Sequence, residues 1–196
     1  MLLIEELIKM QSKKVNSKVL FLAQSALLAA VLCILSPIAI PIGPIPITLG
    51  VFAVMLTGVL LDWKRACAAV AVYILLGLLG LPVFSGGKSG FGVLVGPTGG
   101  YIWSFLFMAV IIALVGGRAR ERYLHEAGFA LIGCVASLVI CYLLGTFQFT
   151  LVADCDWSYA LSVCVYPFIP FDLAKGVCAS LLGVQIRRRL RAAGLV

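Results

Sequence analysis

Long apolar stretches separated by short polar breaks make up most of this 196-residue chain. A helix needs about 20 apolar residues to cross the hydrocarbon core of a bilayer. Six stretches reach or approach that length, and breaks such as the charged run at 62–65 separate them. The pattern therefore predicts an all-α integral membrane protein with six transmembrane helices. The expected spans are Val19–Ile42, Ile45–Leu61, Ala66–Phe84, Phe91–Val115, Phe129–Ala153 and Tyr159–Ile186.

Prolines interrupt this pattern in two places. The segment 36–47, "SPIAIPIGPIPI", is too rich in proline for a regular helix, so we expect the first helix to end near Ser36 and the second to begin near Thr48. Pro167 and Pro170 likewise predict that a helix restarts just before Asp172. At membrane depth, irregular backbone is tolerated only where protein covers it or where it lines a cavity.

The composition agrees with a membrane protein and leaves little for catalysis or metal binding. Hydrophobic residues make up 63% of the chain and charged residues 12%, whereas soluble domains are about half apolar and about a quarter charged. The seven cysteines form no CxxC pair, and their odd number argues against a disulfide framework. With a single histidine, His125, in a charged segment, we expect no metal site and no cofactor.

The basic residues predict the orientation. With six spans and both termini in the cytoplasm, thirteen of the fifteen basic residues fall on the inner side, and only Lys88 and Lys175 lie elsewhere. The net charge of +7 is then explained by topology, and no nucleic-acid partner is expected. Residues 1–18 do not fit a signal peptide, and we expect an amphipathic juxtamembrane segment there, with a disordered segment as the alternative. We expect one membrane domain at 19–186 and a basic cytoplasmic tail at 187–196.

The stretch "PVFSGGKSGFGVLVGPTGGYI" at 82–102 looks at first like a phosphate-binding loop. A nucleotide-binding loop would need glycine five residues before Gly87, and that position is Pro82. The expected topology also places the loop on the outer side. Its glycines permit positive φ angles, and Phe84, Phe91 and Tyr101 lie among them. We therefore interpret it as a loop that folds over a flat, partly apolar ligand, with a flexible connector as the alternative.

Asp172 and Lys175 form the sharpest candidate site. A charged residue within a span costs about 2.5–3.5 kcal/mol on insertion scales and marks a functional site by default. Their spacing places both on one helix face. A carboxylate accepts hydrogen bonds and an ammonium donates them, so the pair suits a small ligand with both donors and acceptors. A structural ion pair, or snorkelling of the two groups to the surface, is the alternative.

These features together resemble the biotin-specific substrate-binding subunits (S components, the BioY family) of energy-coupling-factor (ECF) vitamin transporters. The resemblance spans about residues 19–186 and is most specific in "GLLGLPVFSGGKSGFGVLVGPTGGYI" and "YPFIPFDLAKGVCASLL", with support from "PIGPIPITLG". It departs at Gly50, where the family commonly has a glutamine or another polar residue.

The resemblance implies a six-helix S-component fold in the bacterial inner membrane, with biotin bound in a cavity near the outer face. It implies a transmembrane coupling subunit and two cytoplasmic ATPases as partners. The small-residue face of the first helix, Ala26 and Ala30, would dock on the coupling subunit. Some members of the family are reported to transport without these partners.

The resemblance also suggests roles for individual residues. Asp172 would accept from a ureido N–H of biotin, and Lys175 would donate to the ureido oxygen or to Asp172. Lys88 would face the carboxylate. No bond of biotin is made or broken, so the chain is expected not to be an enzyme. The rings of biotin would pack on the backbone of the glycine loop, at Gly86, Gly87 and Gly90, and on the aromatic side chains of Phe84 and Tyr101. The first loop would contribute Thr48.

Three alternatives stay open at this point. One is an S component for another vitamin, such as riboflavin or thiamine. Another is a biotin transporter that works alone. The third is an intramembrane enzyme, which would need several acids or histidines near one interface. The expected inner loops offer Asp62, Glu121, His125 and Glu126, which we interpret as ordinary loop charges.

Overall fold

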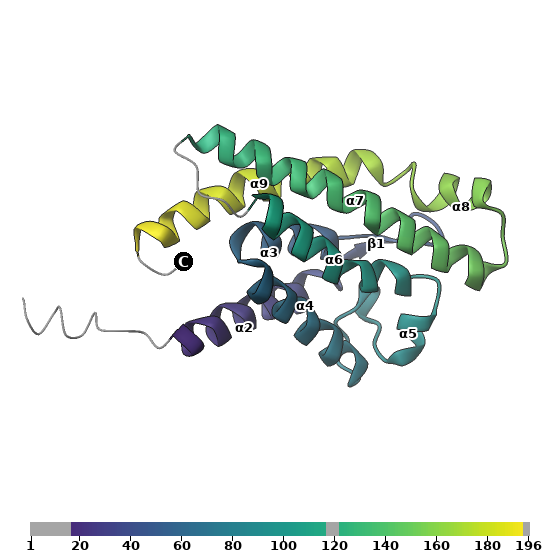
Figure 1. Cartoon of the computed structure of the whole chain (residues 1–196). Helices are drawn as coiled ribbons and strands as arrows, with labels where there is room; N and C mark the ends of the chain where they lie inside the picture. Colours follow the sequence, from purple (N-terminus) through teal and green to yellow (C-terminus); the bar gives the residue numbers. More distant parts are fainter. Residues whose placement is uncertain (1–16, 117–121, 194–196) are drawn as a thin grey trace, which may run out of the picture.

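The structure, a computed structural model, describes residues 17–116 and 122–193 as a bundle of helices (Figure 1). The predictions for residues 1–16, Glu121 and residues 194–196 therefore lie outside the described residues. In chain order the elements are α2 (Ser17–Leu35), β1 (Ala39–Ile40), β2 (Ile47–Thr48), α3 (Gly50–Leu60), α4 (Trp63–Leu78), η1 (Ser85–Gly87), α5 (Phe91–Val95), α6 (Gly99–Gly116), α7 (Tyr123–Ala153), α8 (Trp157–Cys164) and α9 (Ile169–Ala192).

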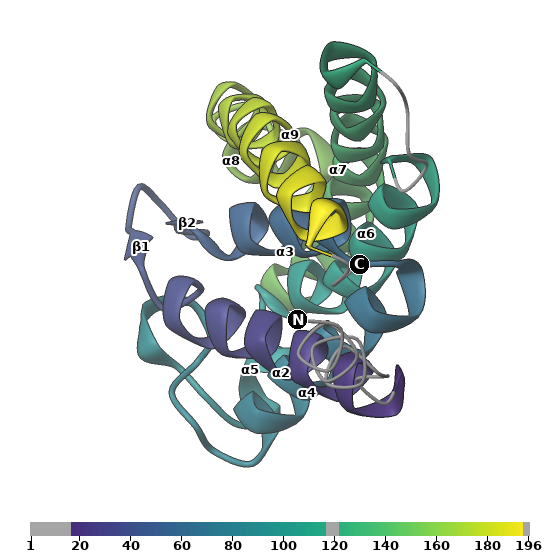
Figure 2. The ribbon, with the colours of Figure 1, turned by 90° about the vertical axis from the view of Figure 1, so that its left-hand side faces the viewer.

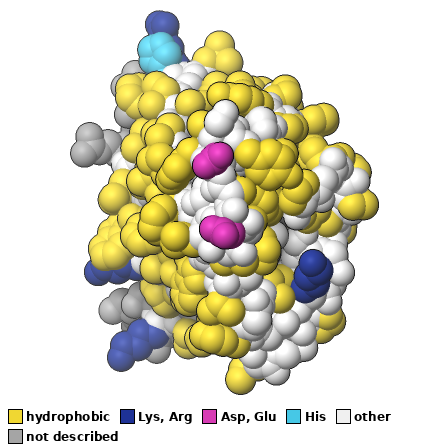
Figure 3. All heavy atoms as spheres, turned by 90° about the vertical axis from the view of Figure 1, so that its right-hand side faces the viewer, with side chains coloured by type: hydrophobic (Ala, Val, Ile, Leu, Met, Phe, Trp, Pro, Cys, Tyr) yellow, Lys and Arg dark blue, Asp and Glu magenta, His cyan; other side chains and the backbone are white. Residues whose placement is uncertain are grey.

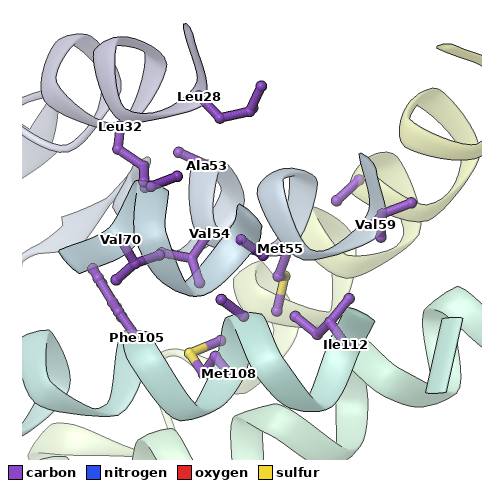
Figure 4. Packing of buried hydrophobic residues seen from close by; sticks show 14 of the residues in the cluster. Leu28, Leu32, Ala53, Val54, Met55, Val59, Val70, Phe105, Met108 and Ile112 are labelled. Atoms are coloured by element: carbon purple, nitrogen blue, oxygen red, sulfur yellow. The ribbon is translucent and has the colours of Figure 1, made fainter. Parts of the chain in front are cut away.

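Helix α3 lies at the centre of the bundle. It contacts α9 and α6, while α2 packs on α4 and α6 packs along α7 (Figure 2). None of the residues of α3 is exposed. Val54, Met55 and Val59 point from α3 into a core completed by residues such as Leu32 and Ile112 (Figure 4). A helix that is apolar on all sides lies either in a protein core or in lipid, and in this bundle the neighbouring helices cover α3.

Within residues 17–116 and 122–193, four helices are long and apolar enough to cross a membrane: Lys18–Leu35, Gly99–Gly116, Tyr123–Ala153 and Ile169–Ala192. Helix α3, with 11 residues, and α4, with 16, are shorter. Large apolar side chains are exposed on the outer faces of the bundle, for example Leu114, Val139 and Leu151. Such surfaces are stable in lipid and rare on soluble monomers. The chain is thus a multi-pass, mostly helical membrane protein, while the count of six spans stays a prediction.

The proline segment is irregular, as predicted. Helix α2 ends at Leu35 and α3 begins at Gly50, and between them β1 and β2 form a short antiparallel hairpin with Ala39 opposite Thr48. Ile45 and Ile47 are buried in a second apolar cluster with residues of α7, α8 and the segment before α9. Protein therefore covers this part of the loop, as membrane depth requires.

The structure corrects the extents of three predicted spans. The third helix stops at Leu78, well before Phe84. The fourth stretch is divided at Gly96–Thr98 into α5 and α6, and the sixth is divided into α8 and α9. Proline explains both divisions, because Pro97 and Pro167 lack the N–H of an interior helical residue. Pro170 instead lies in the first turn of α9, where that N–H is not needed.

Glu126 is not an ordinary loop charge, so that interpretation was wrong. It lies in the first turn of α7 with no exposed surface, and Arg187, Arg188 and Arg191 of α9 bind its carboxylate at 2.6–3.1 Å. Arg187 also donates to the carbonyl of Gly116 at 2.7 Å. The basic segment expected as a tail thus continues α9 and joins it to the adjoining ends of α6 and α7.

Candidate ligand cavity

A cavity is lined by residues from the ends of α2 and α4 and from the starts of α3, α6 and α9. These parts lie toward the end of the bundle that carries α5 and α8, away from the start of α2 and the end of α9 (Figure 1). Figure 3 shows this end of the molecule, where apolar side chains dominate and charged ones are few. The cavity holds about 620 Å³ of space between atoms, its open mouth included. Its lining combines apolar and aromatic side chains with a few polar ones: Ser36, Ile45, Pro46, Thr48, Val51, Tyr73, Ser85, Thr98, Tyr101, Ile102, Phe105, Cys141, Tyr142, Phe168, Asp172 and Lys175.

Asp172 and Lys175 both line this cavity, as an ion pair. The Lys175 ammonium lies 2.9 Å from Asp172 Oδ1, and the Tyr142 hydroxyl donates to Asp172 Oδ2 at 2.9 Å. Asp172 is only 3% exposed. Its carboxylate is therefore held by two donors from two helices. Each carboxylate oxygen can accept a second hydrogen bond, so the group retains capacity for a ligand donor.

The local sequence explains where Asp172 stands. Helix α9 begins at Ile169 with Pro170 in its first turn, and the Asp172 N–H donates to the Phe168 carbonyl at 2.8 Å. An acidic side chain is favoured in the first turn by the free N–H groups and dipole of the helix. Lys175 follows one turn later on the same face. The proline-directed restart thus sets the ion pair at the cavity.

Tyr101 and Thr48 also line the cavity. Tyr101 packs its ring so closely on Gly145 that a Cβ there would overlap it, and its hydroxyl donates to the Cys164 carbonyl at 3.3 Å. Thr48 Oγ1 accepts from the Gly50 N–H at 3.2 Å. A side chain in place of Gly50 would put its Cβ 3.0 Å from Ser36 Oγ, so glycine there gives room to a cavity-lining hydroxyl.

The glycine loop has the predicted backbone but contributes other side chains than expected. Gly86, Gly87 and Gly90 have φ angles of +68°, +74° and +90°, which confirms the positive-φ prediction. These glycines are not among the residues that line the cavity; Ser85 is. The Gly90 N–H donates to the Gly77 carbonyl at 2.7 Å, which fixes the loop on the end of α4.

The structure places Phe84, Phe91 and Lys88 away from the lining. Phe84 is fully buried and packs edge-to-face on Tyr73, with 5.6 Å between the centroids of the two rings. Phe91 is 65% exposed, and Lys88 is exposed too. Phe84 therefore supports Tyr73, which does reach the cavity. Neither Phe91 nor Lys88 belongs to the residues that the structure brings together there.

Sequence reasoning missed several polar lining residues, among them Tyr142, Ser36 and Ser85. Tyr142 lies inside a long apolar helix 30 residues before Asp172, and nothing in its local sequence marks it. Ser36 and Ser85 do have a signal, since each lies in a loop already singled out. The Ser85 hydroxyl oxygen is buried and has no hydrogen-bond partner among the described residues.

This arrangement defines a class of protein. A partly enclosed apolar cavity with a few convergent polar groups is a small-molecule site, and here it lies within a multi-pass helical membrane protein. Across residues 17–116 and 122–193, histidine, cysteine and acidic side chains form no group that could hold a metal ion. The fold and the cavity thus describe a membrane protein with a site suited to a small organic ligand.

Comparison with known proteins gives the family. The model of the BioY family matches residues 10–192. "Biotin transporter BioY2" of Lactococcus lactis subsp. cremoris is 36% identical over 89% of this chain and 94% of that protein. "Biotin transporter BioY" of Thermotoga maritima is 40% identical over 85% of this chain and 95% of that protein. The chain belongs to the BioY family.

A solved structure has the same fold. The S component for biotin from an ECF-type ABC transporter superposes with a TM-score of 0.77 at 28% identity, covering 89% of this chain and 94% of that one. The resemblance drawn from the sequence is therefore confirmed. The family and these relatives are transporters, not enzymes, which removes the enzyme alternative.

Proposed function

We propose that this chain is the biotin-binding subunit of an ECF-type transporter and that it captures biotin from the outer side in the cavity described above. The observation that supports this best is the ion pair between Asp172 and Lys175 in a cavity lined by aromatic rings. Tyr142 donates a hydrogen bond to the same carboxylate. The matches to biotin transporters and to an S component for biotin support the ligand.

The chemistry of biotin suits this cavity. Its ureido ring has two N–H groups and one carbonyl, and these complement an acceptor and a donor that lie side by side. Asp172 would accept from a ureido N–H, while Lys175 would donate to the ureido oxygen. The flat ring system would pack against Tyr101 and Phe168, which line the cavity close to the pair. Thr48 would contribute its side chain from the first loop.

Six membrane crossings with both termini in the cytoplasm agree with the arrangement of the helices. Each of the six apolar stretches contains one main helix: α2, α3, α4, α6, α7 and α9. The start of α2 and the end of α9, where the arginines gather, lie at the same end of the bundle (Figure 1). The positive-inside rule makes that end cytoplasmic, so the cavity faces out of the bacterial inner membrane.

A transmembrane coupling subunit and two cytoplasmic ATPases complete the proposed transporter. Ala26 and Ala30 lie on an exposed face of α2. Small residues four apart let a second helix approach closely, so this face would receive the coupling subunit. Replacing both alanines by leucine should abolish partner-dependent uptake while leaving biotin binding intact. Loss of binding in that variant would contradict a role confined to docking.

The decisive experiment is biotin binding to the purified chain in detergent. Calorimetry should detect saturable binding at micromolar biotin, and riboflavin and thiamine should not compete with labelled biotin. Absence of binding, or displacement by another vitamin, would contradict the proposal. Uptake in cells with and without the coupling subunit and ATPases then separates a partner-dependent chain from one that transports alone.

A further inference from the structure

The turn between α5 and α6, residues 96–98, carries part of the cavity lining. Thr98 ends this turn, and Tyr101 follows in the first turn of α6. Both side chains line the cavity. Their positions therefore depend on how the turn is held against the rest of the bundle.

Gln148 of α7 holds this turn with both N–H groups of its side-chain amide. Its Nε2 donates to the carbonyls of Leu94 and Gly96, each at 2.8 Å. The Leu94 carbonyl also accepts from the indole N–H of Trp103 at 3.3 Å. The Gly96 carbonyl also accepts from the Gly99 N–H at 3.1 Å. The two bonds from α6 stay within the α5–α6 unit, whereas those from Gln148 join this unit to another helix.

The start of α6 lies very close to this amide. A Cβ added at Gly99 would overlap both the Leu94 carbonyl oxygen and Nε2 of Gln148. One helical turn before Gln148, Gly145 of α7 leaves room for the ring of Tyr101, which a Cβ would overlap. Helix α7 therefore holds the turn through Gln148 and receives the neighbouring aromatic ring at Gly145.

An amide within an apolar membrane helix indicates a function. Polar side chains inside spans are costly and usually serve a purpose. Gln148 is not among the residues that line the cavity, so its purpose is not direct contact with the ligand. Both of its N–H groups are instead used on the backbone beside Thr98, a lining residue.

We propose that Gln148 is a positioning residue for ligand binding, which fastens the α5–α6 turn to α7 and so holds Thr98 and Tyr101 at the cavity. It acts through the backbone of the turn and does not touch the ligand. A cavity wall that is already in place loses less freedom on binding, which favours the bound state. This inference rests on the proposed function, because biotin is the ligand whose binding it affects.

The test replaces Gln148 by methionine, which has a similar length and no N–H donor. The carbonyls of Leu94 and Gly96 keep their bonds from α6, so the variant should still fold. Gln185→Met is the matched control, because Gln185 is exposed on α9 and lies outside the cavity lining. Labelled biotin gives the association rate, the dissociation rate and the number of binding sites for each purified chain in detergent.

We expect Gln148→Met to bind biotin about tenfold more weakly, since two hydrogen bonds that hold the cavity wall are lost. The loss should lie in a faster dissociation, with the association rate changed by less than about twofold. The number of sites per chain should equal that of the wild type. A purely structural role would instead lower the number of sites and leave the dissociation rate of the remaining ones unchanged.

Gln148→Asn is a second variant that decides the matter if the methionine variant does not fold. It keeps an amide that is one methylene shorter and cannot hold both carbonyls at once. We expect dissociation to be about threefold faster, the effect of one lost hydrogen bond.

A wild-type dissociation rate in the variants that fold would overturn the positioning role and leave the proposed function standing. An equal acceleration in Gln185→Met would overturn the role in the same way. A wild-type chain that binds no biotin would overturn the proposed function and this inference with it.

Discussion

The hydroxyl of Tyr142 donates a hydrogen bond of 2.9 Å to Asp172 Oδ2, on the opposite oxygen from the one that Lys175 binds. Tyr142 comes from the middle of α7 and Asp172 from the first turn of α9. The contact therefore fixes the carboxylate in the cavity from two helices. A carboxylate that is already oriented loses less freedom when it binds a ligand.

Replacing Asp172 by asparagine should weaken biotin binding at least tenfold. A hydrogen bond to a charged group contributes about 1.5–3 kcal/mol, and about 1.4 kcal/mol is a tenfold change in affinity. The matched control is Asp156→Asn, an exposed acid near the start of α8. Calorimetry on both variants checks this. Equal affinities in the two variants would rule out the role of Asp172.

Tyr142→Phe removes one donor from the Asp172 carboxylate but leaves Lys175 in place. We expect biotin affinity to fall about three- to tenfold, the range for one net hydrogen bond of about 1 kcal/mol. Tyr123→Phe is the control, because its hydroxyl donates to the Leu181 carbonyl, outside the cavity lining. A phenylalanine variant at 142 with wild-type affinity would show that Lys175 alone orients Asp172.

Lys88→Met tests the sequence-based role of that lysine directly. Lys88 is exposed and does not line the cavity, and a solvated charge contributes little at a distance because water and salt screen it. Biotin affinity should therefore change by less than about twofold. Biotin affinity measured at low and at high salt should likewise be nearly the same, because a solvated charge is screened. A loss of tenfold or more would place Lys88 on the ligand after all.

Glu126→Gln should destabilise the bundle. The change leaves Arg187, which is 2% exposed, without its carboxylate partner, and breaking a buried ion pair from one side costs about 3–5 kcal/mol. Thermal unfolding in detergent should show a clearly lower midpoint. Asp62→Asn is the control, because Asp62 pairs with Arg65 at the surface. A midpoint equal to that of the control would mean that the arginines are solvated without Glu126.

Gly77→Ala should disturb the support of the cavity. A Cβ at this position would overlap the ring of Phe84, and overpacking in a core costs about 1–3 kcal/mol. We expect a lower unfolding midpoint and weaker biotin binding, since Phe84 packs against Tyr73. Gly92→Ala in α5 is the control, as nothing lies within 4 Å of its added Cβ. Wild-type stability of Gly77→Ala would show that the ring moves aside freely.

Sequence reasoning recovered much of this protein because lipid imposes simple rules on a chain. Hydrophobic length located the main helices, and the prolines of segment 36–47 correctly marked an irregular loop. The cost of charge in a span singled out Asp172 and Lys175, which share the cavity. Helix extents were less predictable, because Gly96–Thr98 breaks an apolar run without adding a charged residue that hydropathy would detect.

Only the tertiary structure decided which side chains surround the cavity. Tyr142 looks like any residue of an apolar helix until α7 and α9 are packed together. Glu126 looks like a loop charge until the end of α9 reaches it. Lys88 and Ser85 lie three residues apart in one loop, yet only the serine lines the cavity. These outcomes depend on contacts between segments far apart in sequence and on the direction of each side chain. The local pattern of hydrophobic and polar residues predicts neither the contacts nor the directions.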